Sequence, residues 1–170
     1  AGHITYMRTD APSLSKESID DARNYINSSI GEDYLYETPR IYSGTENAQE
    51  AHEAIRPTSA SVTAKDLDKA TEEEVRLYEL IWQQYIACQM KDAEYLSTTA
   101  KIILDQYTFT AKGREVVFDG YTKISNPSNK NQDDGILPSL SENEKLSLES
   151  VNKEKKFTKP PARFSEAALV

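Results

Sequence analysis

The sequence predicts an α+β fold, with a helical N-terminal part followed by an antiparallel β part. Two observations carry this prediction. Before about residue 92, apolar residues recur at the spacing of amphipathic helices, and after about residue 95, β-branched and aromatic residues nearly alternate with polar ones. The composition, 38% apolar with six glycines and seven prolines in 170 residues, is typical of a chain that buries a core.

The first helix is predicted within the stretch "LSKESIDDARNYINSSIG". Ser15 is a suitable N-cap, acidic residues occupy the first two turns, and Gly31 lies just past the end. Ile19, Ala22 and Ile26 recur at helical spacing and are expected to form the buried stripe.

A second, short helix is predicted in "NAQEAHEAIRP". Asn47 can cap it, Glu50 completes a capping-box pattern, and Pro57 should end it near Arg56. His52 and Arg56 are four residues apart and would share one face of this helix.

The third and longest helix is predicted to begin after Thr71, with Glu74 closing a T-x-x-E capping box. The acidic run at 72–74 therefore favours a helix N-terminus over a metal site. The apolar residues of this helix cover more than half of its circumference, so we expect it to be mostly buried. They are Leu77, Tyr78, Ile81, Trp82, Tyr85, Ile86 and Cys88.

The β part is predicted to start in "STTAKIILDQYTFTAKGREVVFDGYTKI". Lys112-Gly113 and Asp119-Gly120 are turn signals, which favours antiparallel strands joined as hairpins. A polar, turn-rich loop is expected at 125–135.

Two further strands are predicted at 144–151, "EKLSLESV", and 155–158, "KKFT", before Pro160-Pro161 stops the pairing. A helix is then expected to begin at Ser165, and no stop signal follows it. The chain is therefore expected to be a piece of a larger protein. Its predicted parts are a helical domain at 1–92, a β domain at 93–159 and the start of a helical segment at 160–170.

Charge and cysteine content exclude several classes of function. The net charge of −8 and pI near 4.9 argue against nonspecific binding of nucleic acid. The basic strip 153–163, "KEKKFTKPPAR", still leaves open a local groove for a phosphate chain. Cys88 is the single cysteine, so no internal disulfide or cysteine-rich zinc site is expected. The sequence shows no membrane span or secretory signal, and we expect a cytoplasmic protein without a membrane partner.

Tyr6 and Arg8 are the strongest candidates for chemistry. In an extended segment, residues two apart point to the same side, so a phenol and a guanidinium could face one phosphate. A phenol oxygen that attacks a phosphodiester needs proton removal and charge stabilisation, and Arg8 would supply the second. His52 could bind phosphate or modulate the proton of the tyrosine. The alternatives are a packed structural tyrosine and a solvated helix histidine.

Five segments carry a resemblance to a known family. "GHITYMRTDAPSLS", "NAQEAHEAIRPT", "LYELIWQQYIACQM", "FDGYTKI" and "FTKPPARFSEAALV" resemble, in this order, the middle of bacterial type IA DNA topoisomerases. The resemblance covers essentially the whole chain. It implies cleavage of one DNA strand by Tyr6, with Arg8 contacting the phosphate and His52 in the active site. Thr9, Asp10 and Arg56 lie in the same motifs without an assigned role.

The resemblance also implies a mechanism and partners. The tyrosine would join a DNA 5′-phosphate, another strand would pass, and resealing would relax negative supercoils. Residues 1–92 would belong to the tyrosine-bearing domain of a toroidal enzyme and the β part to its hinge or arch. Mg2+ would be bound by an acidic Toprim domain that this chain lacks, so the chain alone is expected to be inactive. Its partners would be single-stranded or underwound DNA and the other domains of the enzyme. The alternative is a noncatalytic DNA-gate or interaction module with the same fold.

Overall fold

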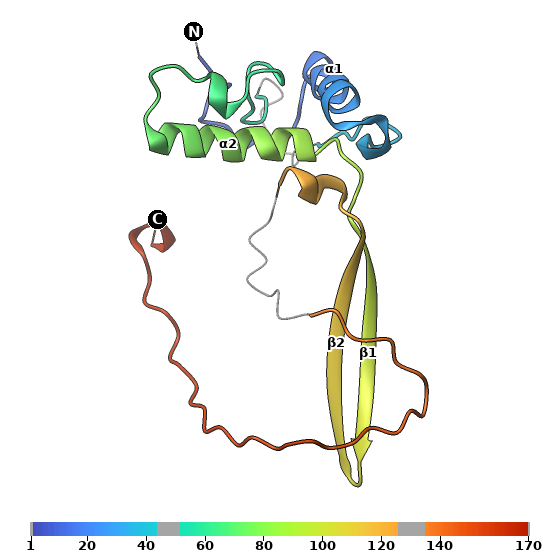
Figure 1. Cartoon of the computed structure of the whole chain (residues 1–170). Helices are drawn as coiled ribbons and strands as arrows, with labels where there is room; N and C mark the ends of the chain where they lie inside the picture. The colour runs from blue at the N-terminus through green and yellow to red at the C-terminus, as the bar shows by residue number, and fades with distance from the viewer. Residues whose placement is uncertain (1, 44–51, 126–134, 170) are drawn as a thin grey trace. The chain divides into compact units, whose positions relative to one another are not determined.

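The computed structural model describes residues 2–43, 52–125 and 135–169, and it confirms an α+β chain with helices before an antiparallel sheet (Figure 1). The chain divides into two units, Ala1–Pro138 and Ser139–Val170, each of which is considered by itself. The principal elements of the first unit are α1 (Lys16–Tyr25), α2 (Glu72–Ala87), β1 (Glu94–Leu104) and β2 (Tyr107–Phe118).

Helix α1 begins where the sequence predicts, and its π-helical continuation ends where the sequence predicts, at Gly31. The Ser15 side chain accepts a hydrogen bond from the Ser18 amide at the N-terminus. The helix continues as a π-helical turn, Ile26–Ile30, and stops at Gly31, whose φ of 131° few other residues tolerate. Ile19 and Ala22 are buried, so the predicted stripe faces the core.

Helix α2 has the predicted capping box, because the Thr71 hydroxyl accepts from the Glu74 amide while the Glu74 carboxylate accepts from the Thr71 amide. The prediction that this helix is mostly buried is wrong for its first two to three turns, where Leu77 and Leu80 are exposed and only Tyr78 is buried. Its C-terminal turns contribute most of its buried residues, among them Tyr85, which is 3% exposed.

The core lies between α1, α2 and the segment around Ala60. Its buried residues are Ala22, Ile26, Ala60, Tyr85, Ile86 and Met90. Hydrogen bonds also connect α2 to α1 and to the segment around Ala60. The Tyr85 hydroxyl donates to the Ser18 carbonyl at 2.6 Å, and the Trp82 indole donates to the Ala60 carbonyl at 2.8 Å. The buried Tyr85 and the partly buried Trp82 therefore contribute both apolar area and satisfied hydrogen bonds.

The prediction of a second helix is wrong for those of its residues that the structure describes, 52–56. Its N-terminal half, with the predicted capping box, lies outside the described residues, and residues 52–56 are not helical. Their backbone groups bind other segments instead: the Ala54 amide donates to the Ser13 carbonyl at 2.8 Å, and the Arg56 carbonyl accepts from the Thr5 amide at 2.9 Å. Tertiary contacts override the local helical pattern here.

Strands β1 and β2 form one antiparallel hairpin. The predicted turn at Lys112-Gly113 is wrong, because β2 runs through both residues and Gly113 pairs with Thr98. The chain reverses instead after Leu104, at Asp105, whose φ is 51°. The Asp119-Gly120 turn signal does mark the end of β2, where a 3₁₀ helix, Gly120–Lys123, begins.

Gly113 occupies a strand position for a packing reason. A Cβ atom there would lie 2.7 Å from both the Gly135 carbonyl oxygen and the Leu137 Cγ atom, closer than atoms can approach. Glycine inside a strand commonly marks such an approach of another backbone. The loop predicted at 125–135 lies outside the described residues except at its two ends.

The second unit, described through residue 169, contains no strand in that part. The two strands predicted at 144–151 and 155–158 are therefore wrong. All described residues of this unit are exposed, and a strand needs a paired neighbour and a buried face to be stable. The helix predicted at Ser165 is present only as a short 3₁₀ turn, Glu166–Ala168.

Candidate functional site

The candidate site is built on two segments that are distant in sequence and lie side by side, residues 3–5 and residues 56–58. The contacts are a hydrogen bond from the Thr5 amide to the Arg56 carbonyl at 2.9 Å, one from the Thr58 amide to the His3 carbonyl at 3.0 Å, and a bridge between Ile4 and Pro57. This pairing places the segment that carries Tyr6 beside the segment that follows His52.

Tyr6 is open to solvent. Its side chain is 68% exposed, although the preceding residue, Thr5, is held against the neighbouring segment. No hydrogen bond to the Tyr6 phenol occurs among the described residues. The phenol oxygen is therefore accessible to a ligand from solution, as a nucleophile must be.

Arg8 is also exposed, but the geometry assumed for the Tyr6 and Arg8 pair is not present. The backbone bends at Met7 and Arg8 instead of continuing as an extended strand. The rule that places residues two apart on one side holds only for extended backbone. Both side chains are exposed, and no hydrogen bond or cation–π contact between them occurs among the described residues.

His52 is partly buried and lies in the non-helical segment, so the prediction that it shares a helix face with Arg56 is wrong. Its backbone carbonyl accepts a hydrogen bond from the Ser13 hydroxyl at 3.1 Å. Because the Ala54 amide also binds Ser13, the backbone on both sides of Glu53 is attached to the chain just before α1.

Glu53 connects this segment to α1 and was not predicted from the sequence. Its Oε1 atom accepts from the Ser15 amide at 2.8 Å and from the Ser18 hydroxyl at 3.3 Å. The same carboxylate binds Arg56 through two nitrogen atoms, Nε at 3.1 Å and Nη2 at 3.0 Å. Partial burial raises the pKa of Glu53, but the hydrogen bonds from Arg56 and Ser15 outweigh it and hold the pKa below its ordinary value.

Arg56 is occupied by these contacts. Besides the two bonds to Glu53, its Nη1 atom donates to the Pro57 carbonyl at 2.9 Å, and its side chain is only 15% exposed. A guanidinium so engaged orders the protein around it and has little capacity left for a phosphate. Arg56 is therefore a structural residue, whereas Arg8 keeps an exposed guanidinium.

The described residues do not form a metal centre. In ranges 2–43, 52–125 and 135–169, no three His, Cys, Asp or Glu side chains gather closely enough to bind an ion. Glu74 serves the capping box of α2, and burial raises the pKa of the Cys88 thiol. Over the same ranges, no helix is long and apolar enough to cross a membrane.

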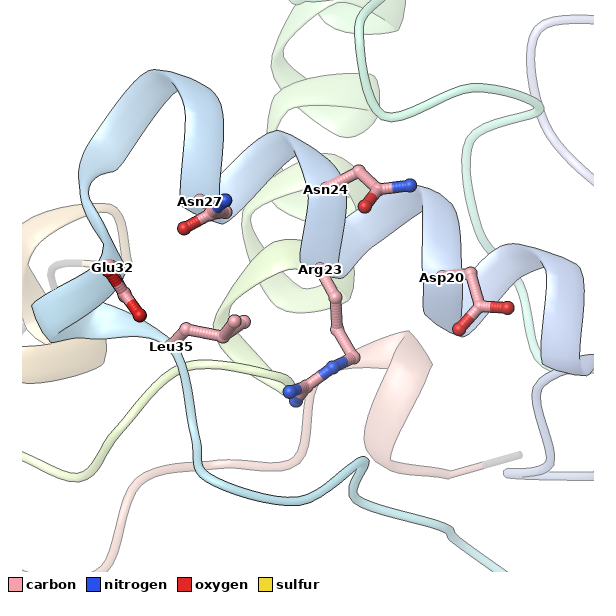
Figure 2. Close-up of a pocket in the computed structure, with 6 residues that line it drawn as sticks. All are labelled: Asp20, Arg23, Asn24, Asn27, Glu32 and Leu35. Carbon is pink, nitrogen blue, oxygen red and sulfur yellow. The ribbon is translucent and has the colours of Figure 1, made fainter.

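A shallow polar pocket of about 410 Å³ lies on α1 and the turn after it, lined by Asp20, Arg23, Asn24, Asn27, Glu32 and Leu35 (Figure 2). None of the predicted site residues lines it. The Arg23 guanidinium donates to the Tyr36 carbonyl at 2.8 Å, so the cation of the pocket is already partnered. This pocket is separate from the candidate site.

Comparison with known proteins places the chain in a family. The sequence model of a family described as DNA topoisomerase matches residues 1–170. The chain is 53% identical over 170 residues to DNA topoisomerase 1 of Pasteurella multocida. The alignment covers 100% of this chain and 20% of that protein. It is 45% identical to DNA topoisomerase 1 of Escherichia coli over the same length, again with 20% of that protein covered.

A solved structure agrees with the sequence comparison. Full-length topoisomerase I from Thermotoga maritima superposes with a TM-score of 0.68 at 32% identity, covering 83% of this chain and 22% of that one. The chain thus spans about a fifth of the length of the proteins it matches. Together, the match over all 170 residues and the structural likeness show that the chain belongs to the DNA topoisomerase family, in its bacterial type IA group.

Proposed function

We propose that this chain is the tyrosine-bearing part of a type IA DNA topoisomerase, and that Tyr6 is the residue that cleaves one DNA strand. The observation that carries the proposal is the exposed Tyr6 phenol, directly after a residue that is fixed to the segment following His52. An accessible nucleophile on an anchored backbone is what attack on a bulky polymer requires. Membership of the family supports the same assignment.

The proposed cleavage needs no external energy source, because one phosphate ester bond is exchanged for another. The phenol loses its proton, its oxygen forms a bond to a backbone phosphorus, and the bond from that phosphorus to the 3′ oxygen breaks. The leaving 3′ oxygen takes up a proton, and the DNA 5′-phosphate remains joined to Tyr6. The reverse attack by the 3′ hydroxyl reseals the strand after passage of another strand, which relaxes negative supercoils.

Arg8 and His52 have supporting roles in this proposal. Arg8 is exposed and free of the ion pairs found among the described residues, so its guanidinium can stabilise charge on the phosphoryl oxygens. His52 lies partly buried in the adjoining segment, where it can donate to a phosphate oxygen or exchange a proton. In this proposal, the three side chains act together on one bound DNA phosphate.

The chain is proposed to act as part of a longer enzyme. It spans 20% of relatives such as the Pasteurella multocida protein. We assign the magnesium-dependent chemistry to other domains of that enzyme. Isolated from those domains, the chain should not turn over. The substrate is single-stranded or underwound DNA, and the location is the bacterial cytoplasm where that DNA lies.

The proposal is tested by Tyr6→Phe in the longer enzyme that carries this chain. This variant should abolish the covalent protein–DNA adduct while binding of a labelled single-stranded oligonucleotide persists. Tyr107→Phe is the matched control, because Tyr107 is 60% exposed but lies at the end of the hairpin. An adduct that survives in Tyr6→Phe would refute the assignment. Absence of an adduct in the unsubstituted enzyme would favour a noncatalytic DNA-gate module.

A further inference from the structure

The residue before Tyr6, Thr5, binds the neighbouring segment through both its amide and its hydroxyl. The Thr5 amide donates to the Arg56 carbonyl at 2.9 Å, and the Thr5 hydroxyl donates to the Ala54 carbonyl at 2.8 Å. The same hydroxyl accepts from the Arg56 amide at 3.0 Å. Thr5 therefore completes two bonds through its side chain that no apolar residue of the same shape could make.

Thr5 is the last such anchor before the nucleophile. From Tyr6 to Asp10, no backbone hydrogen bond to another segment occurs among the described residues, and the amide of Ala11 is bound only locally, by the Thr9 hydroxyl. The position of the Tyr6 backbone is thus set mainly from its N-terminal side. A shift of the Thr5 backbone would be transmitted directly to the next residue.

The segment that Thr5 binds is itself held rigidly. Arg56 is fixed by its two bonds to Glu53, and Glu53 accepts from the Ser15 amide at the start of α1. The same segment carries His52, whose carbonyl is bound by Ser13. Two of the proposed active-site residues therefore share one hydrogen-bonded frame that ends on a helix of the core.

We infer that Thr5 is a positioning residue for the cleavage reaction, which holds Tyr6 at a fixed place relative to His52 through its hydroxyl bonds to Ala54 and Arg56. This inference rests on the proposed function of Tyr6. Its physical basis is that phosphoryl transfer needs the attacking oxygen in line with the leaving oxygen, so a displacement of about 1 Å can lower the rate about a hundredfold. Thr5 does not touch the substrate in this scheme and acts through Tyr6.

The test compares Thr5→Val with Thr5→Ser in the longer enzyme. Valine keeps the shape of threonine and removes the hydroxyl, whereas serine keeps the hydroxyl. Thr58→Val is the matched control from the same pair of segments. The Thr58 hydroxyl is exposed, and its hydrogen bond to the His3 carbonyl is long, at 3.5 Å, so its loss should matter little. The readouts are the single-turnover rate of adduct formation, the dissociation constant for a labelled single-stranded oligonucleotide, and the melting temperature.

Thr5→Val should lower the rate of adduct formation about tenfold to a hundredfold and change the dissociation constant by no more than about twofold. Thr5→Ser should restore most of the rate, and Thr58→Val should behave as the unsubstituted enzyme. A rate unchanged in Thr5→Val overturns the inference. So does a serine variant as slow as the valine variant at an unchanged melting temperature, because the hydroxyl would then not be what matters.

If Thr5→Val fails to fold, Thr5→Ser and Thr5→Asn decide the question at a matched melting temperature. Asparagine keeps donors and acceptors but displaces them, so it should slow adduct formation more than serine does; equal rates overturn the inference. Failure of the inference is distinguishable from failure of the proposed function. If Tyr6→Phe abolishes the adduct while every Thr5 variant cleaves normally, Tyr6 remains the nucleophile and only the positioning role is lost.

Discussion

The Glu53 carboxylate binds both the Arg56 guanidinium, at 3.1 and 3.0 Å, and the Ser15 amide, at 2.8 Å. One side chain thus joins the segment that carries His52 to the N-terminus of α1. Glu53 fixes the surroundings of the site without being a candidate for the chemistry, and its removal should disturb both stability and geometry.

Replacement of Glu53 by alanine should destabilise the chain by about 2–4 kcal/mol, because it leaves a partly buried guanidinium and the Ser15 amide without their acceptor. Urea unfolding can be followed by fluorescence of Trp82, the single tryptophan, whose indole is bound to the Ala60 carbonyl in the core. Glu72→Ala is the control, since its ion pair with Arg76 is long, at 3.8 Å, and exposed. Equal losses in the two variants would contradict this role.

The contribution of Glu53 should depend on pH. Burial raises its pKa, but the bonds from Arg56 and Ser15 lower it more, so the folded value lies below the ordinary 4.5. A lowered pKa means that the stabilisation is present above pH 4.5 and is lost as the pH falls through the folded value.

The difference in unfolding free energy between the unsubstituted chain and Glu53→Gln should therefore shrink as the pH falls from 6 toward about 3. The other carboxylates are the same in both proteins, so their effect on the unfolding free energy cancels in the difference. Urea midpoints of both proteins across the range provide the measurement. A difference that stays constant or grows on acidification would show that the Glu53 charge is not the cause.

Gly113→Ala should disturb the packing of the chain around Gly135 and Leu137 against β2. The new Cβ atom would meet two atoms at 2.7 Å, one of them a backbone oxygen, so we expect a loss of about 1–3 kcal/mol. Gly135→Ala is the matched control, because a Cβ atom there meets nothing within 4 Å. Hydrogen exchange of the β2 amides measures the effect, and similar protection in both variants would contradict it.

Gln89 provides a further test of buried polar pairing. Its side chain is fully buried, donates to the Arg40 carbonyl at 2.8 Å and accepts from the Arg40 amide at 3.1 Å. Gln89→Leu should cost about 1–3 kcal/mol because it leaves both backbone groups unpaired. Gln83→Leu, whose side chain makes only a 3.5 Å bond to Glu79 on α2, should change stability little in the same urea assay. Equal losses of stability in Gln89→Leu and Gln83→Leu would contradict this prediction.

The features that the sequence predicts correctly are those whose causes are local. The N-caps at Ser15 and Thr71 depend on residues three positions away, so reading along the chain finds them. Gly31 ends its helix through its own backbone conformation.

The predictions that are wrong depend on contacts between distant residues. The helix at 52–56 is replaced by pairing with residues about 40 to 50 positions earlier, and Gly113 is a glycine because of Gly135 and Leu137 rather than a turn. Glu53 was missed for the same reason, since its partner Ser15 is 38 positions away. Its spacing of three residues from Arg56 was the one local signal available.

Identification of the residue that becomes joined to DNA tests the central proposal most directly. The longer enzyme is denatured during cleavage of a labelled oligonucleotide, digested, and the peptide that carries nucleotide is sequenced by mass spectrometry. We predict that the modified peptide contains Tyr6, with the DNA attached through its 5′-phosphate to the phenol oxygen. A modified residue other than Tyr6, or attachment through a 3′-phosphate, would contradict the account.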